Sequence, residues 1–239
     1  MKLVVTDGPA ELAEAAASLL RARLEAKPDL VMAVPAGRTP RPMYALLRER
    51  QAAEPVDYSR MRVFCIDELC PPAPSDGYFW RQIRGEFLAW SAVPAERCHP
   101  FRVDTEDLEA MCRAYEVTIA EAGGLDLVML GLGPNAHLAS NEPGTPFDST
   151  VHSVPLFAET VRYILTDDVI QGPVSAHAVT LGLATIMAAR EVVVLVSGRG
   201  KREALRRVLA GGEDVAVPAS VLLSHPDCTI LADRDAVPD

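Results

Sequence analysis

The stretch DLVMLGLGPNAHLASNEPG, residues 126–144, joins a buried strand to a loop rich in polar side chains. An apolar run over 127–130 ends at a Gly-X-Gly turn. The loop that follows carries Asn135, His137 and Glu142 and closes at a Pro-Gly pair. In an open α/β sheet, ligands bind beyond the carboxyl ends of the strands. The stretch therefore predicts a strand that brings a histidine and a carboxylate, groups suited to proton transfer, to a ligand-binding edge.

Apolar runs and helical stretches alternate along the rest of the chain. The expected strands are Leu3–Val5, Leu30–Val34, Arg62–Ile66, Leu125–Leu130, Glu191–Val196 and Cys228–Ala232. The expected helices are Pro9–Glu25, Pro40–Glu49, Tyr78–Ala89, Thr105–Ala122, Val179–Ala189 and Lys201–Ala210. The alternation predicts one domain over residues 1–239, an α/β fold with a doubly wound, mostly parallel sheet and helices on both faces (Rossmann-like). Residues 145–178 show no clear period, and we expect a lid-like segment or an irregular strand pair there.

Composition and charge restrict the class of protein. Of 239 residues, 49% are hydrophobic and 23% are charged, which suits a globular domain with a sizeable core. The net charge of −10 argues against a nucleic-acid partner and a basic membrane-binding surface. Five scattered cysteines and an N-terminus unlike a signal peptide indicate free thiols in a reducing compartment. We therefore expect a soluble, cytoplasmic protein with a small-molecule ligand; a homo-oligomer is possible.

Two further loops after expected strands have the composition of anion sites. Residues 34–40, Val-Pro-Ala-Gly-Arg-Thr-Pro, open a helix and offer Gly37, Arg38 and Thr39 to an anion such as phosphate. The alternative there is a plain strand-to-helix turn. Residues 196–201 contain two glycines and bring Lys201 to a helix start, where a positive charge is unfavourable unless an anion binds.

A fourth loop, Ile66-Asp67-Glu68-Leu69, follows the third expected strand. Adjacent acids at the carboxyl end of a strand suit a general base, and the alternative is a solvated acidic turn or a helix cap.

The sequence indicates neither a metal site nor a redox cofactor. His152, His177 and His225 share no metal-ligand spacing with one another or with the cysteines. No Gly-X-Gly-X-X-Gly motif follows the first expected strand, where a dinucleotide site would begin. We therefore expect a reaction without a cofactor.

Taken together and in this order, the four loops resemble the superfamily of glucosamine-6-phosphate deaminases and 6-phosphogluconolactonases. The resemblance covers nearly the whole chain. The loop at residues 34–40 is similar to the phosphate loop of both branches, whereas the Asn-Ala-His…Asn-Glu-Pro-Gly signature of residues 135–144 is similar to the deaminase branch. Lactonases usually have a Leu-Phe-Pro-Gly ending after the histidine.

The resemblance implies an enzyme that converts an amino-sugar phosphate, glucosamine 6-phosphate, and water into fructose 6-phosphate and ammonia. By that resemblance Asp67 would move a proton between C2 and C1, and His137 would open the sugar ring. Asn135 and Glu142 would position His137. The substrate would be held by Glu68 and, at its 6-phosphate, by a set of loop residues. That set is Gly37, Arg38, Thr39 and Lys201.

Three positions depart from the family pattern. Arg38 stands where a second Gly or a Ser is usual, and Ala136 stands where a Gly is usual. A phosphate-binding arginine expected after Glu142 has no clear counterpart; Leu165 occupies its place, with Arg162 nearby. Arg38 could supply the missing cation, or it could mark a different substrate or a site that no longer binds phosphate. Two other functions stay open: a sugar-lactone hydrolase with His137 as base, and a non-catalytic sugar-phosphate sensor.

Overall fold

Seven parallel strands form the central sheet, in the order β1-β10-β9-β6-β2-β3-β5. The structure is a computed structural model that describes residues 1–70, 76–167 and 174–238. The strands of this sheet are β1 (Lys2–Thr6), β2 (Val31–Val34), β3 (Arg62–Cys65), β5 (Cys98–His99), β6 (Leu127–Gly131), β9 (Glu191–Val196) and β10 (Cys228–Asp233). All residues of β2 and β9 are buried, as their continuous apolar sequences predict for a sheet covered on both faces.

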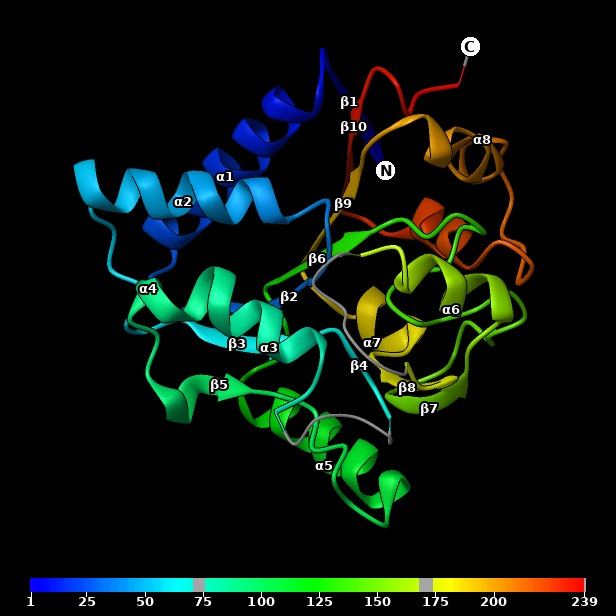
Figure 1. Cartoon of the computed structure of the whole chain (residues 1–239), viewed down its shortest axis with the longest axis horizontal. Coiled ribbons are helices and arrows are strands. Elements are labelled where there is room, and N and C mark those ends of the chain that lie inside the picture. Colours follow the sequence, from blue (N-terminus) through cyan, green and yellow to red (C-terminus); the bar gives the residue numbers. More distant parts are fainter. Residues whose placement is uncertain (71–75, 168–173, 239) are drawn as a thin grey trace.

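Helices cover both faces of this sheet (Figure 1). Helices α1 (Pro9–Ala26), α2 (Arg41–Ala53) and α3 (Phe79–Ile83) lie on one side. Helices α5 (Leu108–Glu121), α7 (Leu183–Met187) and α8 (Arg202–Leu209) lie on the other. The predicted doubly wound α/β fold is confirmed. In the part of the chain that the structure describes, no helix is long and apolar enough to cross a membrane.

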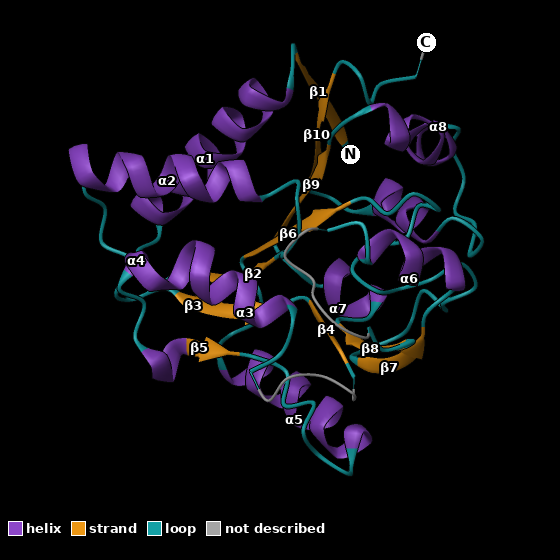
Figure 2. Cartoon of the chain, in the orientation of Figure 1, coloured by secondary structure: helices purple, strands orange, loops and turns teal. Residues whose placement is uncertain are grey.

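A second, antiparallel sheet of three strands lies beside the first (Figure 2). Two of its strands pair with each other where an irregular strand pair was one of the expectations, whereas the third was not expected as a strand. Its order is β4 (Asp67–Leu69), β8 (His177–Thr180) and β7 (His152–Pro155). Residues 145–178 contain β7, helix α6 (Ala158–Ile164) and the first two residues of β8, with residues 168–173 outside the described part. The described part of this segment is more regular than the sequence predicts.

Two predicted helices differ from the observed ones. The expected helix Val179–Ala189 is wrong at its start, because residues up to 180 pair with β4 and the helix begins only after Gly182. A Cβ at Gly182 would stand 2.1 Å from the carbonyl oxygen of Ser149, so the chain turns there at close approach. The expected helix Tyr78–Ala89 is interrupted by a π-helical turn over Arg84–Leu88 before α4 (Ala89–Ser91).

Candidate active site

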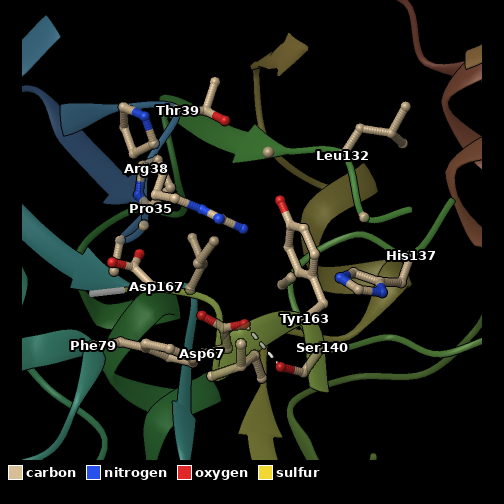
Figure 3. Close-up of a pocket in the computed structure, with 18 of the residues that line it drawn as sticks. Pro35, Arg38, Thr39, Asp67, Phe79, Leu132, His137, Ser140, Tyr163 and Asp167 are labelled. Atoms are coloured by element: carbon tan, nitrogen blue, oxygen red, sulfur yellow. Dashed lines mark hydrogen bonds between the residues drawn. The ribbon is translucent and has the colours of Figure 1, made fainter. Parts of the chain in front are cut away.

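A pocket opens at the carboxyl ends of β2, β3, β6 and β9, where the sequence predicts ligand binding. All four predicted loops contribute to its wall. Helix α6 supplies a further part of the wall, through Tyr163 among others (Figure 3). The predicted residues that line it are Gly37, Arg38, Thr39, Asp67, His137 and Lys201.

Asp67 is a buried carboxylate that faces the pocket. It begins β4, pairs in register with Thr180 of β8, and is 8% exposed. Its Oδ2 accepts a hydrogen bond of 2.8 Å from the hydroxyl of Ser140, a residue that sequence reasoning did not single out (Figure 3). Burial raises the pKa of Asp67 to about 7, the Ser140 hydrogen bond opposes that rise, and the neighbouring charge of Glu68 adds to it. A carboxylate with this pKa exchanges protons readily at neutral pH.

Glu68 differs from the expected substrate contact. It follows Asp67 in the same strand, so its side chain points to the opposite face. Its carboxylate accepts four backbone N–H groups at 2.9–3.1 Å, from Leu69, Tyr78, Phe79 and Trp80. A Cβ at Gly77 would stand 2.3 Å from Glu68 Oε2, so this arrangement of hydrogen bonds leaves room only for a glycine at position 77. Glu68 thus holds the start of α3 and does not line the pocket.

His137 reaches the pocket at the end of a chain of hydrogen bonds. The amide of Asn135 donates from Nδ2 to Glu142 Oε2 at 2.8 Å, while its Oδ1 lies 2.7 Å from His137 Nδ1. Because an amide oxygen only accepts, Nδ1 carries the proton and Nε2 is left with a free lone pair. Glu142 also accepts the backbone N–H of Phe157 at 3.0 Å, which fixes the carboxylate. Asn135 and Glu142 do not line the pocket; Asn135 contacts the ring of His137, and Glu142 contacts Asn135.

Burial lowers the pKa of His137 to about 4, with Glu142 raising it and Lys201 lowering it further. The imidazole is therefore neutral at pH 7 and available as a base. Its loop is tightly built: a Cβ at Gly133 would stand 2.3 Å from the ring, which explains the second glycine of the Gly-X-Gly turn. Ala136, at a position where the family that this chain resembles usually has Gly, adopts a left-handed φ of 69°.

The other end of the pocket is cationic. The Lys201 side chain is 7% exposed, and no carboxylate of the described residues pairs with it. Its Nζ lies 4.3 Å from the centre of the Tyr163 ring, and Arg38 Cζ lies 4.8 Å from the same ring. Burial lowers the pKa of Lys201, and the phenol of Tyr163 opposes that shift. A buried ammonium without a carboxylate partner has the chemistry that suits an anionic ligand.

The loop at residues 37–39 offers fewer free backbone N–H groups to an anion than expected. The N–H of Gly37 donates to Oε1 of Gln82 at 2.8 Å and is therefore already engaged. Arg38 is exposed, with Nη1 3.4 Å from the carbonyl oxygen of Thr166. Arg162, the alternative cation of the sequence, is exposed and lies outside the pocket wall. Neither Tyr163 nor Gln82 was predicted as a site residue, because neither lies in a predicted loop after a strand.

The chain is similar to known proteins over nearly all of its length. The family model of glucosamine-6-phosphate isomerases/6-phosphogluconolactonase matches residues 7–231. A glucosamine-6-phosphate deaminase of Shouchella clausii (strain KSM-K16) is 34% identical over 241 residues, 99% of this chain and 96% of that protein. A second, of Halothermothrix orenii (strain H 168 / OCM 544 / DSM 9562), is 33% identical over 243 residues, 99% of this chain and 98% of that protein.

Solved structures agree with this similarity. A monomeric glucosamine-6-phosphate deaminase superposes with a TM-score of 0.93 at 30% identity, covering 99% of this chain and 98% of that one. A 6-phosphogluconolactonase from Trypanosoma brucei shares the fold at a TM-score of 0.78 and 24% identity, over 98% and 97% of the two chains. The chain therefore belongs to the family of glucosamine-6-phosphate isomerases and 6-phosphogluconolactonases.

Proposed function

We propose that this protein is an enzyme, a glucosamine-6-phosphate deaminase, which converts glucosamine 6-phosphate and water into fructose 6-phosphate and ammonia. The observation that carries the proposal is the pairing of two groups in one pocket. One end holds the buried carboxylate of Asp67 and the other the buried ammonium of Lys201. An amino-sugar phosphate matches both, because its phosphate needs a cation and its C1–C2 edge needs a carboxylate base. The relatives named above carry this activity in their names.

His137 acts first in the proposed reaction. Its neutral Nε2 accepts the proton of the O1 hydroxyl while the C1–O5 bond breaks, and the same proton then passes to O5. The result is an open-chain aldehyde with an amine on C2. Asn135 and Glu142 keep the ring of His137 in the required tautomer throughout.

Asp67 then moves a proton from C2 to C1. The ionised carboxylate takes the C2 proton while O1 takes a proton from the C2 ammonium, which leaves a neutral enolamine. Asp67 then returns its proton to C1, which leaves an iminium ion at C2. Water adds to that carbon, the C2–N bond breaks and ammonia leaves, so the product is the ketose phosphate. Each step uses groups already in the pocket wall.

Ammonia release from glucosamine 6-phosphate tests the proposal directly. We expect the wild-type protein to release ammonia and Asp67→Asn to release none above background. Hydrolysis of 6-phosphogluconolactone that persists in Asp67→Asn, without ammonia release by the wild type, would instead identify a lactone hydrolase. Binding of both sugar phosphates without turnover would identify a sensor.

We further propose that Arg38 shares the phosphate with Lys201 in place of the arginine that the family pattern places later in the chain. Both side chains contact the ring of Tyr163 at the same end of the pocket. We expect Arg38→Gly to raise KM for glucosamine 6-phosphate about tenfold, the worth of one partly exposed charge-assisted hydrogen bond, with kcat nearly unchanged. Arg162→Gly, on the exposed side of α6, is the matched control and should change neither constant. An unaltered KM in Arg38→Gly would exclude this role.

A further inference from the structure

Gln82 is a buried amide in the wall of the active-site pocket, and no step of the proposed reaction uses it. It lies in α3 and is 9% exposed. Its Oε1 accepts the backbone N–H of Gly37 at 2.8 Å. This hydrogen bond fixes which way the amide faces, because the reverse orientation would set Nε2 against another donor.

The second half of the same amide has no partner. Nε2 of Gln82 is buried, and none of the residues that the structure describes accepts a hydrogen bond from it. A buried N–H group without an acceptor costs free energy, and the hydrogen bond from Gly37 to the other half of the amide does not remove that cost. A fixed, unpaired donor in the wall of a ligand pocket therefore indicates an acceptor that arrives with the ligand.

The proposed function leaves few substrate atoms that could accept a hydrogen bond from Nε2 of Gln82. Lys201 and Arg38 lie at the phosphate end, Asp67 lies at the C1–C2 edge, and His137 serves O1 and O5. The oxygens that remain without a partner are the hydroxyls on C3 and C4, between the two ends of the molecule. Gln82 lines the pocket, is hydrogen-bonded to Gly37 of the anion loop, and lies in the helix whose start is anchored by Glu68, the neighbour of Asp67.

We infer that Nε2 of Gln82 donates a hydrogen bond to the C3 or C4 hydroxyl of the substrate and makes the site selective for that hydroxyl. This inference rests on the proposed function, and it deepens it by assigning a residue to the middle of the sugar chain. A neutral amide suits this task, because a hydroxyl oxygen carries no charge and a donor that loses its acceptor penalises the analogue that lacks it.

The experiment measures binding, so its result does not depend on turnover. Open-chain 2-amino-2-deoxyglucitol 6-phosphate lacks a carbonyl group and cannot react; it is titrated calorimetrically beside its 3-deoxy and 4-deoxy analogues. We expect the wild type to bind one of the two deoxy analogues at least tenfold more weakly than the parent compound. In Gln82→Met, the parent compound should bind about tenfold more weakly, and its advantage over that analogue should disappear.

Inorganic phosphate and Gln51→Met serve as controls. Gln51 bonds at both ends of its amide to the backbone of Val56, away from the pocket, so its replacement should leave the preference between analogues unchanged. Phosphate should bind Gln82→Met at least as well as the wild type. Gln82→Leu repeats the test if the methionine variant fails to fold.

Two outcomes would overturn the inference. In one, the wild type binds all three compounds equally. In the other, Gln82→Met weakens all three, or phosphate itself, by the same factor, as a contact to the anion would. The proposed function fails separately, when the wild type binds the parent compound but releases no ammonia from glucosamine 6-phosphate.

Discussion

Replacing Asp67 with asparagine should abolish activity and, at the same time, stabilise the folded protein. The carboxylate is buried, and its pKa is raised from 3.8 to about 7 in the folded state. Between these two values the folded state retains a proton that the unfolded state has released. Unfolding therefore becomes easier as the pH rises from about 4 to about 7, and the loss is complete above that range.

The size of the effect follows from the same two pKa values. At about 1.36 kcal/mol for each pH unit, the ionised carboxylate costs about 4 kcal/mol of folding free energy at pH 8 and about 1.5 kcal/mol at pH 5. Asparagine carries no charge, keeps an oxygen to accept the hydroxyl of Ser140, and avoids this cost. The stability gained by Asp67→Asn should thus be about 2.5 kcal/mol larger at pH 8 than at pH 5.

Urea denaturation of both proteins at the two pH values measures this difference, because the other titrating groups are common to both and cancel. Equal m-values are required for the comparison. A gap between variant and wild type that is the same at pH 5 and pH 8 would refute the reasoning, since it would mean that Asp67 has an ordinary pKa in the folded state.

Three more outcomes follow from the site. The kcat/KM for glucosamine 6-phosphate should rise with pH and level off above about pH 7, as Asp67 ionises while His137, with its pKa of about 4, is already neutral; a profile flat from pH 5 to 8 would contradict this. Lys201→Met should raise KM about 100-fold, the cost of removing one partner of a buried charged contact, and leave kcat within a few-fold; an unchanged KM would place the phosphate elsewhere. Gly133→Ala should lower kcat about 100-fold, because its Cβ would stand 2.3 Å from the His137 ring and displace it. Gly85→Ala, whose Cβ would meet no atom within 4 Å, is the control, and equal activity of the two alanine variants would show that the ring need not move.

The convergence of the four loops could be predicted from sequence because parallel strands bring their carboxyl ends to one edge of a sheet. Continuous apolar runs such as Val192–Val196 identify such strands, and the residues after them are then neighbours in space. Arg38, Asp67, His137 and Lys201 are at least 29 residues apart from one another in the sequence, yet all line one pocket. The prediction that the loops converge did not require knowledge of any contact between particular side chains.

The sequence analysis did not predict that Asp67 faces the pocket while Glu68 faces away from it, although the sequence contained a signal for this difference. Two consecutive residues of a strand point to opposite faces, so only one of them can enter the pocket. The strand is three residues long and has no period of its own, which made it look like an acidic loop. Its partner β8 lies 110 residues later, and only that pairing defines β4 as a strand.

Gln82 and Tyr163 were missed for a different reason. Both belong to helices that enter the pocket from outside the set of loops that follow the parallel strands. Their roles depend on which turn of the helix faces inward. For α6 this is fixed by its packing in one apolar cluster with described residues such as Leu156 and Val174, in a segment without a sequence period. Periodicity identifies elements and their buried faces, but it does not tell which polar side chain on a helix faces a ligand.

Two of the buried ionisable groups that line the pocket, Asp67 and Lys201, are each suited to a different part of the proposed substrate. Neither Asp67 nor Lys201 has an oppositely charged partner among the described residues, and burial shifts the pKa of each toward its neutral form. In the free protein each group therefore reduces stability, because an ionised side chain without a partner is costly to bury. We propose that a substrate phosphate beside Lys201 supplies the missing charge there, and that Asp67, with its raised pKa, takes a proton from the substrate. On this proposal the same burial serves binding at Lys201 and proton transfer at Asp67.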